Sequence, residues 1–147
     1  MYYSLIGLLA LLLLVITNHD ILGRNKDASL AQKKYRRFLF AVMVYYITDI
    51  LWGIFDSLSL TSALFIDTEL YFIAMAIGIF CWTQYVIAYL EGKNTFRTLL
   101  TVAGMVFFIA VVIIVAVNTF LPIMFWFDEA GVYHEGIARN IALIFQI

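Results

Sequence analysis

Long runs of apolar residues alternate with short polar connections along the chain. The first run covers Tyr2 to Thr17, and others follow at about Phe38 to Leu58, Leu70 to Leu90 and Phe96 to Asn118. A helix needs roughly 20 apolar residues to cross the hydrocarbon core of a bilayer. The last three runs meet this requirement and the first comes close to it, so we expect four membrane-spanning helices.

The first run could instead be a cleaved signal peptide. Such a peptide begins with basic residues and ends at a small-residue cleavage site. Met1-Tyr2-Tyr3 carries no basic side chain, and the leucine-rich run continues to Asn18-His19-Asp20. We therefore favour an uncleaved membrane helix.

The residues after Pro122 follow a different pattern. Asp128-Glu129-Ala130-Gly131 lies between two aromatic segments, and Asp first with Gly fourth is typical of a hairpin turn whose glycine has a positive φ. We expect a small extracytoplasmic β-hairpin at about 125–135, with its aromatic side chains at the depth of the lipid headgroups. A last apolar run begins near Ile137 and stops at Ile147, which is too short for a span. We therefore expect the N-terminal part of a longer protein, cut inside its fifth helix.

Composition supports a membrane protein. Hydrophobic residues make up 65% of the chain and charged residues 13%, against about 45–50% and about 25% in soluble domains. A soluble fold of this length could not bury so much apolar surface. We expect one membrane-embedded domain over 1–147 in the cell membrane, with the fold class all-α: a polytopic transmembrane helix bundle of four full spans and a truncated fifth.

The distribution of charge predicts the orientation of this bundle. Eight of the nine Lys and Arg residues fall in the first and third connections, and Arg139 alone lies elsewhere. Basic residues favour the cytoplasmic side of a membrane. We therefore expect the N-terminus outside and the long polar stretch from Asn18 to Arg37 in the cytoplasm.

This polar stretch holds most of the basic residues of the chain. Asp27-Ala28-Ser29 could begin a short helix that leads into the second span. Because the charges lie close to two membrane segments, we expect contact with anionic lipid headgroups rather than with nucleic acid. The residues expected to make this contact are Arg24, Lys26, Lys33, Lys34, Arg36 and Arg37.

The second expected span carries a carboxylate among apolar residues. At 1.5 Å per residue, Asp49 lies about 18 Å along the helix from Arg37, inside a hydrocarbon layer of about 30 Å. Tyr45, Trp52 and Asp56 share its helical face, because the four residues follow i, i+4, i+7 and i+11. Ionisable residues in membrane spans often mark functional sites, so this face is a candidate ligand site.

The third expected span offers a matching face of small and aromatic residues. Gly78, Trp82 and Tyr85 lie along it, and Ala74 with Gly78 forms a step of small residues that lets two helices approach closely. Counting inward from an outer connection over Ser57 to Glu69, Gly78 and Trp82 are expected near the depth of Asp49. The two faces would then enclose an aromatic pocket for an unknown small ligand.

A structural role for Asp49 is nearly as well supported as a ligand or proton role. In this alternative the carboxylate only joins helices, with a tyrosine or Thr48 as its hydrogen-bond partner. No catalytic residues, metal site or cofactor are expected, because the polar residues do not form a nucleophile, base and oxyanion set.

Several segments resemble those of a known family. They are Tyr35-Arg36-Arg37-Phe38-Leu39-Phe40, Tyr45-Tyr46-Ile47-Thr48-Asp49-Ile50-Leu51-Trp52-Gly53, Tyr71-Phe72-Ile73-Ala74-Met75-Ala76, Trp82-Thr83-Gln84-Tyr85 and Phe125-Trp126-Phe127-Asp128-Glu129-Ala130-Gly131-Val132-Tyr133. Together they are similar to the N-terminal membrane region that precedes GGDEF diguanylate cyclase or histidine-kinase modules in clostridial (Firmicute) signalling proteins. The resemblance implies about seven helices and a cytoplasmic output domain.

The leading hypothesis is a membrane sensor domain that detects a small ligand or membrane signal and controls a C-terminal cytoplasmic module, with diguanylate cyclase first and histidine kinase next. We also expect a homodimer. One alternative is a small-molecule or proton-coupled transporter, although no internal repeat is visible in the sequence. Another is a structural membrane anchor.

Overall fold

The chain is largely helical. The computed structural model describes residues 2–23, 28–90, 95–129 and 131–144, with the side chains of 4–23, 28–90, 95–129 and 131–140. The elements are α1 (Tyr2–Thr17), α2 (His19–Leu22), α3 (Leu30–Ser57), α4 (Thr61–Tyr89), α5 (Thr95–Asn118), β1 (Phe125–Phe127), β2 (Tyr133–Glu135) and α6 (Ile137–Ile144). Within the described residues, α3, α4 and α5 are long and apolar enough to cross a membrane, and α1 is a shorter apolar helix. The chain is therefore a multi-pass membrane protein by the length and composition of these helices.

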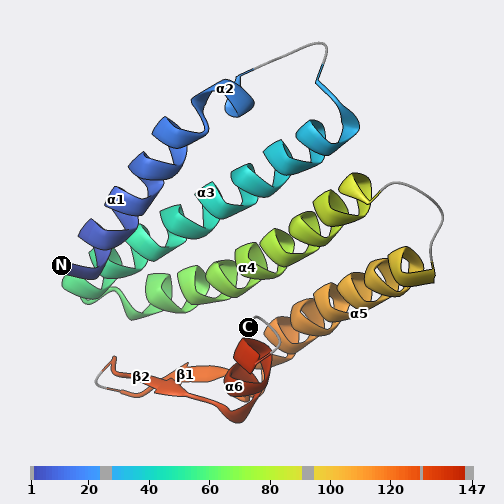
Figure 1. Cartoon of the computed structure of the whole chain (residues 1–147). Helices are drawn as coiled ribbons and strands as arrows, with labels where there is room; N and C mark the ends of the chain where they lie inside the picture. Colours follow the sequence, from blue (N-terminus) through green and yellow to red (C-terminus); the bar gives the residue numbers. More distant parts are fainter. Residues whose placement is uncertain (1, 24–27, 91–94, 130, 145–147) are drawn as a thin grey trace.

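The long helices lie side by side in the order of the sequence. α1 packs against α3, α3 against α4, and α4 against α5. Successive long helices run in opposite directions, and the hairpin and α6 lie at the end where α3 and α5 finish and α4 begins (Figure 1). Large apolar side chains such as Leu9 and Ile113 are exposed on α1 and α5, which indicates contact with the lipid bilayer.

α3 is one continuous helix rather than a short helix followed by a span. Ser29 caps its N-terminus: the Ser29 hydroxyl accepts from the backbone N–H of Gln32, and the Gln32 side chain accepts from the backbone N–H of Ser29. This reciprocal capping box satisfies two backbone donors that a helix start otherwise leaves free. Lys33, Lys34 and their basic neighbours therefore lie on the first turns of α3, not on a separate element.

The connection between α3 and α4 is much shorter than expected. α4 begins at Thr61 instead of about Leu70, and a tight turn at 58–60 joins it to α3. Ser59 adopts a positive φ of 54° in this turn. The expected loop over Ser57 to Glu69 was wrong, because its acidic residues indicated solvent although Asp67 points into the protein. α4 gains more than two helical turns as a result.

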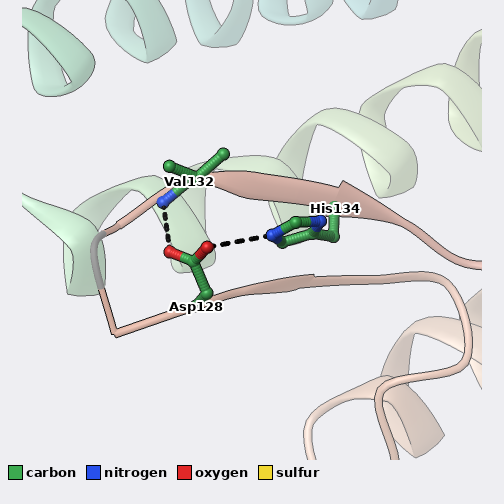
Figure 2. Close-up of polar contacts among 3 residues, drawn as sticks. All are labelled: Asp128, Val132 and His134. Atoms are coloured by element: carbon green, nitrogen blue, oxygen red, sulfur yellow. Dashed lines mark hydrogen bonds and ion pairs between the residues drawn. The ribbon is translucent and has the colours of Figure 1, made fainter.

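The hairpin expected at about 125–135 is confirmed. β1 and β2 pair antiparallel, with Phe127 opposite Tyr133. The backbone N–H of Gly131, which has a φ of 77°, donates to the Asp128 carbonyl at 2.9 Å. Figure 2 shows the Asp128 carboxylate closing the turn: it accepts from the backbone N–H of Val132 at 2.9 Å and from Nε2 of His134 at 3.0 Å.

A buried asparagine fixes the hairpin to the end of α5. Asn118 Oδ1 accepts from the backbone N–H groups of Met124 and Phe125, and its Nδ2 donates to the Phe125 carbonyl. Gly136 permits the return of the chain, because a Cβ at this position would overlap the backbone of Ile123. The hairpin is thus held through side-chain and backbone contacts at both of its ends.

The hydrophobic core lies between α4, α5 and the hairpin. Phe125 is fully buried there, and its ring packs against the rings of Phe65 and Phe72. The core residues are Phe72, Ala76, Val111, Val115, Met124 and Phe125. The hairpin is therefore part of the packed protein, and Phe125 faces its core rather than lipid.

The expected span at about Phe96 to Asn118 is confirmed as α5, and a helix, α6, begins at Ile137, where the fifth span is predicted to start. The rest of that predicted span, after residue 144, lies outside the described residues.

Candidate functional site

A cavity of about 380 Å³ lies where α3 and α4 meet the hairpin and α6. Its lining residues come from four elements, which the chain brings together from segments far apart in the sequence. They are Asp49, Trp52, Thr68, Tyr71, Phe72, Tyr133 and Arg139. A cavity of this size, mostly aromatic and with a few charged groups, has the character of a small-molecule site.

Asp49 lies between this cavity and α1. The backbone of α1 comes so close at Gly7 that a Cβ there would lie 2.7 Å from Asp49 Oδ2. One turn further along the same helix pair, Gly53 packs against the side chain of Ser4. These two glycines let α1 and α3 approach closely, so α1 covers one side of the carboxylate while the other side lines the cavity.

Two tyrosines on facing helices form the next layer of the site. The hydroxyl groups of Tyr45 and Tyr71 are hydrogen-bonded at 3.0 Å, and their ring centroids are 4.9 Å apart. Thr48 is buried, and its hydroxyl donates to the Tyr45 carbonyl at 2.8 Å. The hydroxyls suggested as partners of Asp49 by the structural alternative therefore make other hydrogen bonds.

A second carboxylate, absent from the sequence-based site, lies near Asp49. Asp67 is 3% exposed, and its Oδ2 has no hydrogen-bond partner within the described part of the chain. Asp67 and Asp49 are close enough to interact electrostatically. The available signal was the spacing of Asp67 and Tyr71, which are one helical turn apart and therefore share a face of α4.

The hairpin and α6 form the remaining wall of the cavity. Arg139, in the first turns of α6, lines the cavity and also forms an ion pair with Glu135. Tyr133 lines the cavity from β2, and burial raises the pKa of its hydroxyl. Neither residue was predicted as part of the site, because the contact between a hairpin and a distant helix pair leaves no local pattern in the sequence.

The expected site residues divide into two groups in space. Tyr45, Asp49 and Trp52 lie at or beside the cavity, and Trp52 and Asp56 also line an adjoining cavity of about 330 Å³. The adjoining cavity reaches Tyr133 as well. This part of the predicted face on α3 is therefore brought together by the structure.

Trp82 and Tyr85 lie elsewhere, toward the start of α3. The Trp82 ring is 5.1 Å from that of Phe38, and the Tyr85 ring is 5.0 Å from that of Tyr35. The expectation that Trp82 shares the depth of Asp49 was wrong. The residues of the predicted outer loop form the first turns of α4, so the residues that face Asp49 shift by more than two turns.

Gly78 does not provide a close approach between helices. A Cβ built on Gly78 meets no atom within 4 Å. Like Trp82, Gly78 does not line the cavity. Among the glycines of α4 and α5, the close contact is at Gly104, where a Cβ would lie 3.0 Å from the Thr83 side chain.

The side chains of the site can hold a ligand by charge and by contact with aromatic rings. The site combines carboxylates, aromatic faces and one guanidinium, and the described residues contain no group of three metal-ligating side chains. Comparisons with family models, with curated proteins and with solved structures found no match to this chain.

Proposed function

We propose that this chain is the membrane input domain of a signalling protein, in which a small ligand in the Asp49 cavity controls a module that follows α6. The observation that carries the proposal is the shared lining of the cavity. Asp49 of α3, Tyr71 of α4 and Arg139 of α6 all contribute to it. A ligand there would contact the last described helix directly.

Signalling requires that the ligand bind two arrangements of the protein with different affinity. α3 and α4 are in contact from the Tyr45–Tyr71 pair to the Tyr35–Tyr85 pair, whereas α6 meets them at the cavity and the hairpin. Occupation of the cavity would therefore favour one position of α6 relative to α3 and α4. The change would pass along α6 into the rest of the protein.

The proposed orientation places the cavity toward the outer face of the membrane, with the N-terminus outside. Lys33, Lys34 and their basic neighbours lie at the end of the bundle opposite the hairpin, while Glu129 and Glu135 lie on the hairpin (Figure 1). Basic side chains favour the cytoplasmic side. Contact with anionic headgroups is proposed for Lys33, Lys34, Arg36 and Arg37, and the expected contacts at Arg24 and Lys26 lie outside the described residues.

The proposed output follows the resemblance to clostridial membrane regions. The favoured output module is a diguanylate cyclase, and a histidine kinase is the second choice. In either case we propose a homodimer whose output domains meet in the cytoplasm. A cyclase of this kind would be measured by its product, cyclic di-GMP, and a kinase by autophosphorylation.

The function is tested on the complete protein in membranes. Output is measured during titration with candidate ligands for the natural protein, Asp49→Asn, and the matched control Asp20→Asn, whose carboxylate is fully exposed far from the cavity. We expect a ligand response in the natural protein and the control, and a reduced response in Asp49→Asn. Equal responses of all three proteins would exclude Asp49 from the mechanism.

The same preparation separates the other functional classes. Accumulation of a labelled ligand inside sealed vesicles would identify a transporter. Unchanged signalling in a protein that carries both Asp49→Asn and Asp67→Asn would identify a structural anchor.

A further inference from the structure

The cavity and its surroundings hold more carboxyl groups than free basic side chains among the described residues. Asp49 lines the cavity, Asp67 is buried close by with an unpartnered oxygen, and no basic side chain among the described residues forms an ion pair with either. The guanidinium of Arg139 is already paired with Glu135. An ionised carboxylate that is buried without a counter-charge is costly, so a positively charged ligand would stabilise the ionised form and be held by it.

The walls around this charge are aromatic. Trp52, Tyr71, Phe72 and Tyr133 all line the cavity with Asp49. The negative faces of such rings attract cations, and the attraction is strongest when the cation has lost its water. A metal ion instead requires several oxygen ligands in a compact shell, which ring faces do not supply.

We propose that the Asp49 cavity binds an organic ammonium ion with an apolar body, held by the Asp49 carboxylate and the surrounding aromatic rings. The proposal rests on the proposed function for the identity of the site and adds the chemical class of its ligand. Asp67 contributes long-range attraction, and the volume of about 380 Å³ leaves room for the apolar body.

The test uses pairs of compounds that differ in charge but little in shape. The purified chain is placed in nanodiscs of phosphatidylglycerol, a lipid without an ammonium group, and binding is measured by calorimetry with the heat from empty nanodiscs of the same lipid subtracted, because this anionic lipid itself attracts cations. Phenethylamine is compared with 2-phenylethanol, and choline with its uncharged analogue 3,3-dimethylbutan-1-ol. We expect each cation to bind at least about tenfold more tightly than its neutral partner, which corresponds to about 1.4 kcal/mol.

Variants locate the binding site. Asp49→Asn should weaken phenethylamine binding by about tenfold or more, and Asp67→Asn should weaken it by a smaller factor. The control Asp20→Asn should bind as the natural chain does, because Asp20 is exposed at the far end of the bundle. The compound pairs on the natural chain keep the test decisive if a variant does not fold.

The ammonium group could belong to a soluble amine or to a lipid headgroup. Replacing half of the phosphatidylglycerol with phosphatidylethanolamine distinguishes them. The swap also lowers the anionic surface charge, so an equal share of an uncharged lipid without an amine serves as the reference. If the headgroup occupies the cavity, the apparent affinity for phenethylamine falls further with phosphatidylethanolamine than with the reference lipid; if the ligand is a soluble amine, the two mixtures give the same affinity. Either result agrees with an ammonium site.

Two results would overturn the proposal. Neutral analogues that bind as tightly as the cations would remove the ammonium class, and phenethylamine binding that is unaffected by Asp49→Asn would place any amine site elsewhere. Neither result would contradict the input-domain proposal. Conversely, an amine that binds at Asp49 without any effect on output would contradict the input function and leave the ammonium site in place.

Discussion

Among the single residues, Asp49 is enclosed by groups from several elements. The sequence shows this carboxylate as a charge in an apolar helix, and the helical period predicts the face of the helix on which it lies. One side of the carboxylate is covered by Gly7 of α1, which no local pattern indicated. The position of Asp49 therefore depends on a glycine that appears unremarkable in the sequence.

Gly7→Ala should weaken ligand binding, because the added Cβ must displace Asp49 Oδ2. Gly78→Ala is the matched control, since its Cβ meets no atom within 4 Å. Alanine stabilises a helix interior by about 0.5–1 kcal/mol relative to glycine, so the control should be slightly more stable. We expect phenethylamine affinity to fall about tenfold in Gly7→Ala only, as measured by calorimetry. Equal affinities would show that Asp49 adapts without cost.

Asn118→Ala should destabilise the docking of the hairpin. It removes hydrogen bonds to Met124 and Phe125 and leaves buried backbone groups unpaired. The expected loss is about 2–4 kcal/mol, because each unpaired buried group costs roughly 1–3 kcal/mol. Hydrogen exchange of the hairpin amides measures the effect.

The control for this change is Thr119→Ala, which removes an exposed hydrogen bond to Glu69. It should change the free energy of opening of the hairpin amides, as measured by hydrogen exchange, by less than about 0.5 kcal/mol. Similar exchange in both variants would contradict the anchoring role of Asn118.

At the scale of elements, the sequence predicted α5 and the hairpin well and the start of α4 poorly. The periodic apolar pattern and the turn chemistry of Asp128 and Gly131 are local signals. The segment before Leu70 is helical instead, and it buries both Leu64 and Asp67 against the usual preference of acidic residues for solvent. Because of this one boundary error, the depths predicted for Gly78 and Trp82 were also wrong.

The hairpin contributes an ionisable side chain, Tyr133, to the wall of the cavity. Burial raises the pKa of this hydroxyl, so the folded protein binds its proton more tightly than the unfolded chain. Stability from this group is therefore complete below a pH of about 10 and is lost as the pH rises further. Unfolding measured from neutral to alkaline pH should show a decline that is shallower in Tyr133→Phe. An identical decline in that variant would assign it to other groups.

At the scale of the whole molecule, charge is separated between the two ends of the bundle. Lys33 lies on the first turns of α3 and Glu129 on the hairpin, at opposite ends in Figure 1. This separation follows from the alternation of basic and acidic connections in the sequence. It could be predicted without the structure because it depends only on the order of the helices.

The proposed orientation predicts which positions a membrane-impermeant maleimide can label in intact cells. Cys81 is first replaced by serine, and single cysteines are introduced as Glu129→Cys or Lys33→Cys, both at exposed positions. Glu129→Cys should be labelled from outside, and Lys33→Cys only after permeabilisation. The opposite pattern would invert the topology.

The cavity itself could not be predicted in full from the sequence. Asp49 and Trp52 came from one helical face, but Arg139 and Tyr133 join them through the docking of the hairpin on α4 and α5. Only the folded molecule brings these segments together, and this contact is what connects the site to α6.

In the proposed mechanism, a ligand in the Asp49 cavity moves α6 relative to α3. Spin labels at exposed Ile54 on α3 and Ile137 on α6, in the Cys81→Ser background, would report the distance between the two helices. We predict that phenethylamine shifts this distance distribution in the labelled protein that retains Asp49 and leaves it unchanged in the labelled Asp49→Asn variant. An unchanged distribution in the labelled protein that retains Asp49, under conditions where calorimetry shows the cavity to be occupied, would contradict a ligand-driven movement of α6.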